Sequence, residues 1–279
     1  MQQTNINPVE MLPMFIIWIL IMIGAIFLIK KKKLDQKIAL IMLLISFIMS
    51  GIILGGLPNP VSPIQSIAVN LGKGEAIQSI IPFFIILLLL LGSSLIFGRM
   101  FCSYACPLGA SQEAISKLNF KNTLKEQKKV KFAYTGNQKI SSVIRIFFFV
   151  IFIVMAYILG QQASALINPF IGFQIITKVA LVPIITIIII LIMSIFVYRP
   201  WCRYLCPYGM LADLVSRFSY FKLRRTDKCT DCGICEKICP TNEAGADSKK
   251  GECYYCNRCI ISCPANAIIL SGPLESEQK

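Results

Sequence analysis

Eight of the twelve cysteines lie near the end of the chain, in a spacing that occurs twice. Each copy reads C-x2-C-x2-C-x3-C-P. The x2 spacings let three thiolates of one loop bind three irons of one [4Fe–4S] cubane, and the fourth cysteine, before proline, ligates the other cubane. The spacing predicts a first cluster on Cys229, Cys232, Cys235 and Cys263. It predicts a second cluster on Cys253, Cys256, Cys259 and Cys239.

Two other uses of these eight cysteines fit the sequence less well. All-cysteine zinc sites also contain C-x2-C pairs, but they do not need the interleaved C-P signature. A disulfide framework does not suit a reducing cytoplasm. The chain has no histidine, which excludes His-ligated haem, His-ligated zinc and Rieske centres.

The other four cysteines belong to a second pattern, R-x-x-C-x-Y-x-C-P-x-G, which occurs at Arg99–Gly109 and again at Arg199–Gly209. In a helical turn, positions i and i+4 share a face, so each pair presents two thiolates in one direction. Two pairs supply enough ligands for one [2Fe–2S] or [4Fe–4S] cluster or for another metal ion. They could instead be redox-active thiols or small apolar residues at helix ends. These four are Cys102, Cys106, Cys202 and Cys206.

Basic residues flank both cysteine patterns. Beside the four paired cysteines they are Arg99, Arg199 and Arg203. Their charge is expected to lower nearby thiol pKa values and to offset the negative charge of a cluster. Next to or between the other eight cysteines they are Lys228, Lys237 and Arg258. These are expected to raise reduction potentials or to attract an acidic partner.

These motifs must be positioned by a largely apolar chain, in which 56 % of the 279 residues are hydrophobic and 15 % are charged. A hydrocarbon core of about 30 Å needs about 20 apolar residues. Within lipid every backbone group must be bonded inside its own segment, so stretches of this length are predicted to be helices. The predicted spans are Leu12–Ile29, Ile38–Leu57, Ile77–Phe97, Ile146–Ala165 and Val179–Tyr198.

The lysines and arginines predict the orientation of these spans. All but Lys73 and Lys178 lie in 30–37, 98–145 and 199–279, which the positive-inside rule assigns to the cytoplasm. No basic residue precedes the first span and no small-residue cleavage site follows it, so we expect a retained helix with its N-terminus outside. The C-terminus is then cytoplasmic, in the cell membrane of a prokaryote. The net charge of +14 therefore indicates membrane topology and not nucleic-acid binding.

The membrane part contains two similar units with the same orientation. Each has an outward helix, an outer N-P-x4-Q loop starting at Asn59 or Asn168, an inward helix and a cysteine pair. Parallel repeats are related by an axis along the membrane normal, which would bring the two cysteine pairs together. Asn-Pro favours a capped helix start in each loop. Alternatively, the loops line a lipophilic pocket where Gln65 and Gln174 face a quinone headgroup.

The predicted fold is an α-helical integral membrane bundle of five spans, with two parallel two-helix repeats and a C-terminal 2[4Fe–4S] bacterial-ferredoxin-like α+β domain. Its parts are an extra N-terminal helix with a basic stop segment, repeat 1, a basic cytoplasmic loop, repeat 2 and the ferredoxin domain. Their bounds are 1–37, 38–116, 117–142, 143–219 and 220–279. The basic run Lys117–Lys139 is interpreted as an orientation signal near anionic lipid or as a docking surface for an acidic partner.

On these residues, over about residues 38–270, the sequence resembles the NapH/NosR/MauN group of membrane iron–sulfur proteins. The resemblance implies a quinol-oxidising or electron-relay component that serves a reductase or a maturation pathway. NapH-type members pass electrons from the quinol pool towards periplasmic nitrate reductase. Two features differ from the group. NapH-type proteins usually have four spans, which makes the helix at 12–29 additional. The extracytoplasmic flavin domain of NosR-type proteins is not expected here, so a flavin would belong to a partner.

The favoured function is one-electron relay through two [4Fe–4S] clusters. The relay would connect the quinol pool, or another membrane donor, with a partner reductase or flavoprotein, as an electron-transfer component of an oxidoreductase system. A first alternative is a metal-centre assembly factor in which the paired cysteines bind or reduce a metal ion such as copper. A second is a redox sensor, which would need an output domain in addition to the ferredoxin residues.

Overall fold

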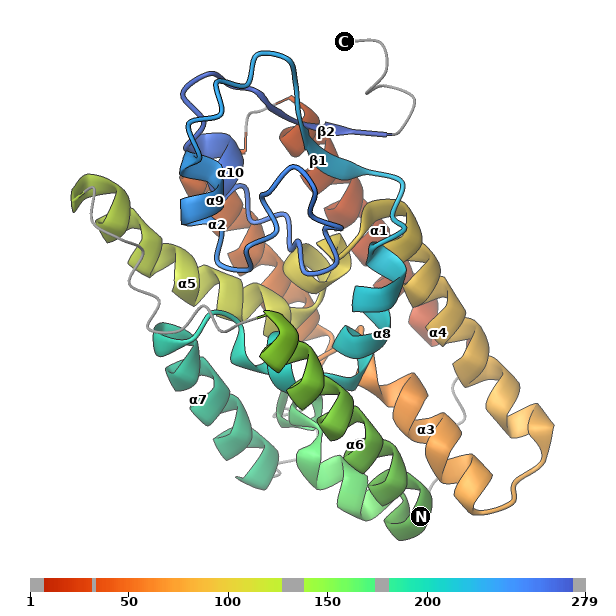
Figure 1. Cartoon of the computed structure of the whole chain (residues 1–279). Helices are drawn as coiled ribbons and strands as arrows, with labels where there is room; N and C mark the ends of the chain where they lie inside the picture. The colour runs from red at the N-terminus through yellow and green to blue at the C-terminus, as the bar shows by residue number, and fades with distance from the viewer. Residues whose placement is uncertain (1–7, 32–33, 127–137, 174–180, 273–279) are drawn as a thin grey trace.

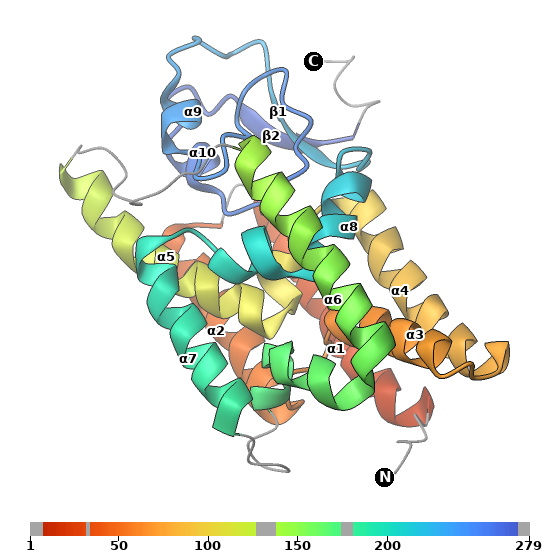
Figure 2. The ribbon, with the colours of Figure 1, turned by 60° about the horizontal axis from the view of Figure 1, so that its bottom comes forward.

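The computed structural model describes the backbone of residues 8–31, 34–126, 138–173 and 181–272. Within these ranges it describes the side chains except those of 8–15, 118–126, 138–139 and 161–167. Long helices form a bundle, and a small segment with two short strands, 220–272, covers one end of it (Figure 1). A view turned by 60° shows the same arrangement (Figure 2). We call 220–272 the C-terminal segment.

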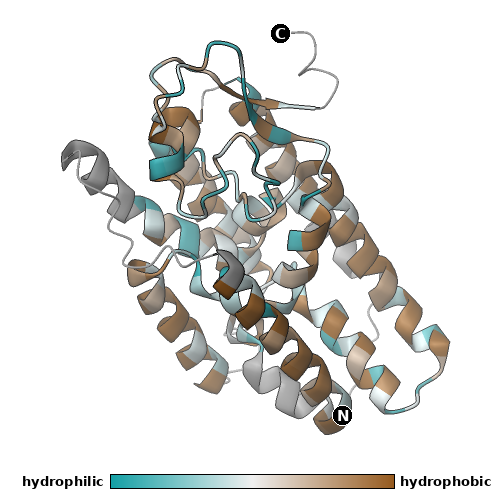
Figure 3. Ribbon diagram, in the orientation of Figure 1, coloured by the Kyte–Doolittle hydropathy of each residue, from teal (hydrophilic) through white to brown (hydrophobic). Residues whose placement is uncertain are grey.

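The apolar stretches of the sequence form the long helices of the bundle. Figure 3 shows that α4, α6 and α7 are hydrophobic over most of their length. Large apolar side chains such as Ile77, Phe147 and Ile158 face outward, as expected of helices surrounded by lipid. These elements are α1 (Pro8–Lys30), α2 (Gln36–Ser46) continued by the π-helix η1 (Phe47–Ile53), α4 (Ile77–Phe97), α6 (Gln138–Ile167) and α7 (Leu181–Phe196).

Three helical stretches in the described part of the chain are long and apolar enough to cross a membrane: Gln36–Ile53, Ile77–Phe97 and Ile140–Gly160. Two further apolar helices, Ile16–Lys30 and Leu181–Phe196, are shorter. The helical character of the predicted spans is therefore confirmed over most of their length. Five crossings of the membrane stay a prediction.

The two paired-cysteine motifs fold in the same way. Each motif contains a π-helical turn, η2 (Phe101–Ala105) or η4 (Trp201–Leu205). The next residue, Cys106 or Cys206, is extended, and its N–H donates to the carbonyl five residues earlier at 3.0 or 2.9 Å. The i, i+4 prediction assumed an α-helical turn, and the observed turns are wider. Such π-turns frequently occur at functional sites.

Each π-turn leads into a helix that begins with proline, α5 (Pro107–Glu126) or α8 (Pro207–Ser216). Proline suits the first helical position because its fixed φ is helical and because the N–H that it lacks would have no intrahelical partner there. α5 packs against α7, and α8 packs against α4. Each of these helices therefore packs on the apolar helix of the other half of the bundle. Tyr208 at the start of α8 donates its hydroxyl to the Leu90 carbonyl of α4 at 3.0 Å.

The predicted basic loop 117–142 differs from the structure at both ends. Residues 117–126 are the end of α5, and Gln138 begins α6. The segment 127–137 lies outside the described residues. This helical end was not predicted, because the lysine content was interpreted as an orientation signal or a docking surface without regard to helical periodicity.

The outer loops begin as the Asn-Pro signal predicts. Asn59 Oδ1 accepts hydrogen bonds from the N–H groups of Val61 and Ser62 at 3.0 and 3.2 Å, and α3 (Val61–Gly72) starts there. Asn168 Oδ1 accepts from the Phe170 N–H at 3.1 Å at the start of the 3-10 turn η3 (Pro169–Phe173). α3 packs between α4 and α6.

The C-terminal segment combines short strands with short helices, which confirms its predicted α+β character. β1 (Lys222–Arg225) pairs antiparallel with β2 (Ile268–Ser271), with Lys222 opposite Ser271. Between the strands, α9 (Ile234–Ile238) contacts α10 (Arg258–Ile261). The cysteine-rich loops occupy the remainder of the segment.

Gly109 is required by the close approach of α5 to its own π-turn. A Cβ at Gly109 would overlap the carbonyl oxygen of Cys102. Gly109→Ala should destabilise the folded protein by about 1–3 kcal/mol, the usual cost of overpacking. The measurement is the temperature at which detergent-solubilised protein loses its monodisperse peak on size exclusion.

Gly92→Ala is the matched control, because nothing lies within 4 Å of a Cβ at this position of α4. Replacing a helical glycine with alanine there should be neutral or stabilising by about 0.5–1 kcal/mol. Equal thermal behaviour of the two variants would contradict the predicted clash.

Candidate iron–sulfur sites

The two cysteine-rich loops of the C-terminal segment have the same backbone conformation. In the first loop φ is positive at Asp231 (47°) and Gly233 (70°), on either side of Cys232. In the second loop φ is positive at Tyr255 (52°) and Asn257 (64°), on either side of Cys256. Left-handed backbone is unusual for residues other than glycine and asparagine. Its recurrence at matching positions shows that both loops curl in the same sense.

In each Cys-Pro pair, the cysteine Sγ accepts a hydrogen bond from the backbone N–H of the residue four positions later. The Glu243 N–H donates to Cys239 Sγ and the Ala267 N–H donates to Cys263 Sγ, both at 3.3 Å. Hydrogen bonds to the sulfur ligands stabilise their negative charge and tune the potential of a bound cluster.

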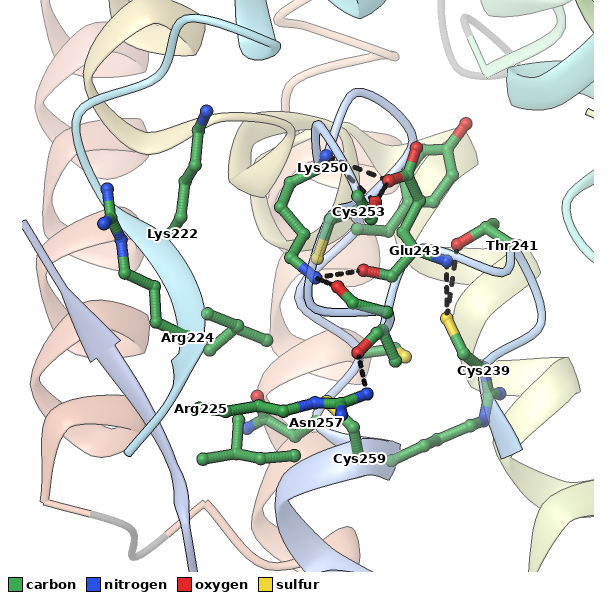
Figure 4. Close-up of a pocket in the computed structure, with 18 of the residues that line it drawn as sticks. Lys222, Arg224, Arg225, Cys239, Thr241, Glu243, Lys250, Cys253, Asn257 and Cys259 are labelled. Atoms are coloured by element: carbon green, nitrogen blue, oxygen red, sulfur yellow. Dashed lines mark hydrogen bonds between the residues drawn. The ribbon is translucent and has the colours of Figure 1, made fainter. Parts of the chain in front are cut away.

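The cysteines line two cavities in the two groups that the spacing predicts. A narrow cavity of about 20 Å³ is lined by Cys229, Cys232, Cys235 and Cys263. A wider cavity of about 420 Å³, shown in Figure 4, is lined by Cys239, Cys253, Cys256 and Cys259. We call these the first site and the second site. Their four-thiol donor sets fit [4Fe–4S] clusters, and cluster binding stays a prediction.

A site for a single metal ion would need side chains that converge on one point. Among the residues that the structure describes, no three Cys, Asp or Glu side chains gather around the position of one ion. A cubane does not require this, because each of its ligands binds a separate iron.

The four paired cysteines are buried together at the end of the bundle. Cys102, Cys106, Cys202 and Cys206 are each 4–6 % exposed. Burial raises the pKa of Cys106 well above its usual value, and Cys202 and Cys102 raise it further, so the thiols of the two halves act on one another. We call these four cysteines the membrane-edge site.

The predicted effect of arginines on these thiols is right in direction but smaller than the effect of burial. Burial raises the pKa of Cys102 to about 12, although Arg99 and Arg199 lower it. Burial therefore favours the neutral thiols in the absence of a metal, and a metal that binds them must displace protons.

Two hydrogen bonds reach the sulfurs of the second half of the membrane-edge site. Gln112 Nε2 donates to Cys202 Sγ at 3.4 Å, and the Gly209 N–H donates to Cys206 Sγ at 3.4 Å. Gln112 comes from α5 of the first half and also accepts from the Trp201 N–H at 3.2 Å. The first half thus supplies a sulfur contact to the second.

Glu113 of α5 is the centre of a buried ion network. Its Oε2 accepts from Arg199 Nε at 2.9 Å and from the Tyr198 hydroxyl at 2.7 Å, and its Oε1 lies 3.3 Å from Arg258 Nη2. Burial favours the neutral acid, but Arg258 and Arg199 together lower the pKa of Glu113 to about 2. Glu113 is therefore ionised and connects the second half of the bundle with the C-terminal segment.

A second network forms around Glu252, the residue before Cys253. Its carboxylate pairs with Arg145 of α6 at 2.9 Å and with Arg203 of η4 at 3.3 Å. Arg145 also pairs with Asp213 of α8 at 3.1 Å. These side chains are buried, so the pairs act in a low dielectric.

Cations outnumber carboxylates in these networks. We call the contact of the C-terminal segment with the two cysteine turns the junction. Its described residues include six buried cations: Arg99, Lys117, Arg145, Arg199, Arg203 and Arg258. They include three buried carboxylates: Glu113, Asp213 and Glu252. Burying unbalanced charge is costly unless an opposite charge is bound nearby.

The loop of the second site rests directly on both cysteine turns. Ser103 Oγ donates to the Tyr254 carbonyl, and the Tyr104 hydroxyl donates to the Tyr255 carbonyl at 3.0 Å. The Tyr254 hydroxyl donates to the Cys202 carbonyl at 3.4 Å and receives a hydrogen bond from Arg99. Tyr254 thus contacts the cysteine turns of both halves of the bundle.

The structure describes one of the two glutamines that were predicted to face a quinone headgroup. Gln65 is 5 % exposed, and its Oε1 accepts from Asn168 Nδ2 at 3.0 Å, which joins the two outer loops. Gln174 lies outside the described residues. The contact of Gln65 explains its burial without a quinone.

Several residues of the site were missed from the sequence, and one signal could have found two of them. Glu113 and Asp213 each lie seven residues after the second cysteine of their pair, so the repeat itself carries an acid. Gln112, Glu252 and Tyr254 show no comparable pattern. Their roles depend on contacts between segments far apart in the sequence.

Comparison with known proteins supports the iron–sulfur interpretation. A family model described as "4Fe-4S binding domain" matches residues 80–125 and 179–226, which contain the two paired-cysteine turns, and another with the same description matches 224–242. Protein MJ0750 of Methanocaldococcus jannaschii is 30 % identical over 203 residues, which are 71 % of this chain and 81 % of that protein. The ferredoxin-type protein MauN of Paracoccus denitrificans is 28 % identical over 57 % of this chain and 54 % of its own length. NosR of Stutzerimonas stutzeri is 27 % identical over 64 % of this chain and 25 % of its own length. NapH of Haemophilus influenzae is 23 % identical over 60 % of each chain.

The chain belongs to the NapH/NosR/MauN-type iron–sulfur proteins. YccM of Escherichia coli is 27 % identical over 74 % of this chain, and the match spans 60 % of YccM. No solved structure matches the chain. The matched iron–sulfur regions contain both paired-cysteine turns and the first C-terminal loop, which includes Cys229, Cys232, Cys235 and Cys239.

Glu113→Gln should destabilise this protein. Removal of one partner from a buried ion pair leaves the other charge unpaired and costs about 3–5 kcal/mol. Here Arg199 and Arg258 would face a neutral amide. The measurement is the melting temperature of the detergent-solubilised, iron-loaded protein.

Glu236→Gln is the matched control. Glu236 is about half exposed and pairs with Arg225 at the surface, where an ion pair contributes about 0–1 kcal/mol. A Glu113→Gln protein as stable as the Glu236→Gln protein would contradict the role of Glu113 at the junction.

Proposed function

We propose that this protein relays single electrons between a quinone pool in the membrane and a cytoplasmic partner. The observation that carries the proposal is the position of Tyr254, whose backbone and side chain contact the turns of Cys102 and Cys202. It joins the second site to the membrane-edge site. Iron–sulfur clusters, when bound, supply one-electron carriers. Relatives named as ferredoxin-type proteins support this assignment.

In this proposal the eight C-terminal cysteines hold two [4Fe–4S] clusters in the predicted groups. The first site uses Cys229, Cys232, Cys235 and Cys263, and the second uses Cys253, Cys256, Cys259 and Cys239. The matching backbone curls and N–H···S bonds of the two loops support the assignment.

A third cluster at the membrane-edge site follows from the charge of the junction. Six cations and three carboxylates are buried at the junction, so positive charge is in excess there. Four thiolates around iron carry net negative charge and would offset this excess. The match of a 4Fe-4S family model to both paired-cysteine turns supports the same reading. The unbalanced cations favour a cluster over structural cysteines.

The proposed topology has five membrane spans in two parallel repeats, with the N-terminus outside and the C-terminal segment in the cytoplasm. The matching π-turns and the reciprocal packing of α5 on α7 and α8 on α4 support a two-fold repeat. The basic residues near the junction support its cytoplasmic placement.

The protein's own side chains position the two sites against each other and limit the access of water. Arg99, Ser103 and Tyr104 fix the loop of the second site on the cysteine turns. Tyr198 and Glu113 fix the guanidinium of Arg199 beside the Cys102 carbonyl. Tyr104, Tyr254 and Tyr255 are buried at the contact between the two sites, which limits the access of water.

Iron content tests the proposal. Protein purified without oxygen should contain about twelve iron atoms per chain if all three sites hold [4Fe–4S] clusters, and about eight if only the C-terminal cysteines do. Serine at Cys102, Cys106, Cys202 and Cys206 should lower the higher count to the lower one. Iron and acid-labile sulfide are measured on both proteins, with EPR of the reduced samples.

Equal iron content in the two proteins would contradict the third cluster. If wild type and the serine variant hold the same iron, the membrane-edge site carries no cluster and the relay into the membrane fails. Binding of copper by wild type but not by the variant would then favour the metal-assembly function, for which four buried thiols are suited.

A further inference from the structure

The three sites lie in a defined order. The second-site loop contacts the membrane-edge turns through Tyr254 and Tyr255, and Lys117 of α5 donates to the Cys256 carbonyl at 2.9 Å. In the first site Cys232 is exposed, and the neighbouring Asp231 side chain is 85 % exposed. The second site is therefore the inner one, and the first site faces the cytoplasm.

The inner site is surrounded by fixed positive charge. Lys117 and Arg258 are buried beside Cys256. Lys250, which is also buried, lines the same cavity, and so does Arg225, which lines both cavities. Lys222 and Arg224 line it as well, but Figure 4 shows their side chains extending away from Cys253 and Cys259. The acid that lines it is Glu243, and the neighbouring Glu252 is already paired with two arginines.

The outer site has one cation on its wall, Arg225. Arg225 is paired with Glu236 and lies 3.6 Å from the Asp231 carboxylate. The lysines that the sequence places beside this loop, Lys228 and Lys237, are exposed, where water and salt screen their charge. Of the three cations predicted to raise potentials, Arg258 alone is buried.

This asymmetry has a direct redox consequence. Reduction adds one negative charge to a site. Buried cations stabilise that charge more than screened surface cations do, because the interaction acts in a lower dielectric. Net charge and solvent exposure are two of the factors that set iron–sulfur potentials. Water also stabilises the reduced state of the exposed outer site. The proposal is that the buried cations of the inner site outweigh this solvation and give the inner site the higher affinity for an electron.

We propose that the buried charge of this protein directs electrons inward, from the exposed first site to the second site and on to the membrane-edge site. The chain would then receive electrons from a low-potential one-electron carrier in the cytoplasm and deliver them to the membrane. This inference rests on the proposed relay and adds its direction.

The electron balance is simple. Each cytoplasmic carrier would lose one electron to the clusters that the first-site, second-site and membrane-edge cysteines would hold. Two such electrons, with two protons taken from water, would convert one membrane quinone to quinol. The chain's own residues change neither charge nor bonding in this sequence.

The test is an EPR-monitored redox titration of full-length protein in detergent. Signals are assigned with Cys229→Ser for the first site and Cys256→Ser for the second. The expected midpoint potential of the second site is more positive than that of the first. A more positive midpoint at the first site would overturn the inference.

Charge variants test the cause. Lys117→Gln should shift the second-site midpoint to more negative potential and leave the first-site midpoint unchanged. Lys228→Gln, the same substitution at an exposed lysine beside Cys229, should move neither midpoint. If Lys117→Gln does not fold, Lys250→Gln serves the same purpose, because Lys250 is buried and lines the second-site cavity. An unshifted second-site midpoint in the folded variant would contradict the electrostatic account.

The titration also separates this inference from the proposed function. Absence of a third EPR signal would contradict the membrane-edge cluster, whereas the order of the first two midpoints would still test the direction of flow.

Discussion

Five arginines and one lysine are buried where the C-terminal segment meets the two cysteine turns, and three carboxylates are buried with them. Removing a charge from water costs several kcal/mol unless partners replace the lost solvation. The carboxylates do this for some of the cations, through Glu113 and Glu252. The remaining positive charge needs anionic neighbours. The membrane-edge thiols lie near Arg99 and Arg199, and Cys256 of the second site lies near Lys117 and Arg258. Cluster binding and folding of the junction are therefore expected to depend on each other.

The reciprocal packing of the two halves places these groups together. Arg99 of the first half donates to the Gly209 carbonyl of the second, and Arg199 of the second donates to the Cys102 carbonyl of the first at 3.0 Å. Each arginine thus stabilises the turn opposite its own. Neither cysteine pair could keep its position if the other half were displaced. The loop of the second site then covers both turns at once, which is why a single segment can connect the membrane region with the cytoplasmic one.

Much of this arrangement could be predicted from the sequence, because the signals are local. Cysteine spacing predicted the two cavity groups, apolar length predicted the helices, and Asn-Pro predicted the start of α3. The π-turns were not predictable from an i, i+4 rule, since that rule assumes an α-helix. The helical end of the lysine-rich segment was missed because charge was considered without periodicity. The contacts of Glu113 with Arg258 and of Tyr254 with Cys202 join residues far apart in the chain. No single-sequence pattern encodes such contacts.

One continuous path would join the membrane-edge site to the second site. Magnetic coupling between reduced clusters tests this path most directly, because coupling requires that both sites be occupied and close. EPR spectra of fully reduced wild-type protein should show a second-site signal broadened by a neighbouring spin. The same signal should sharpen in the variant with serine at Cys102, Cys106, Cys202 and Cys206. Identical second-site signals in the two proteins would contradict the account.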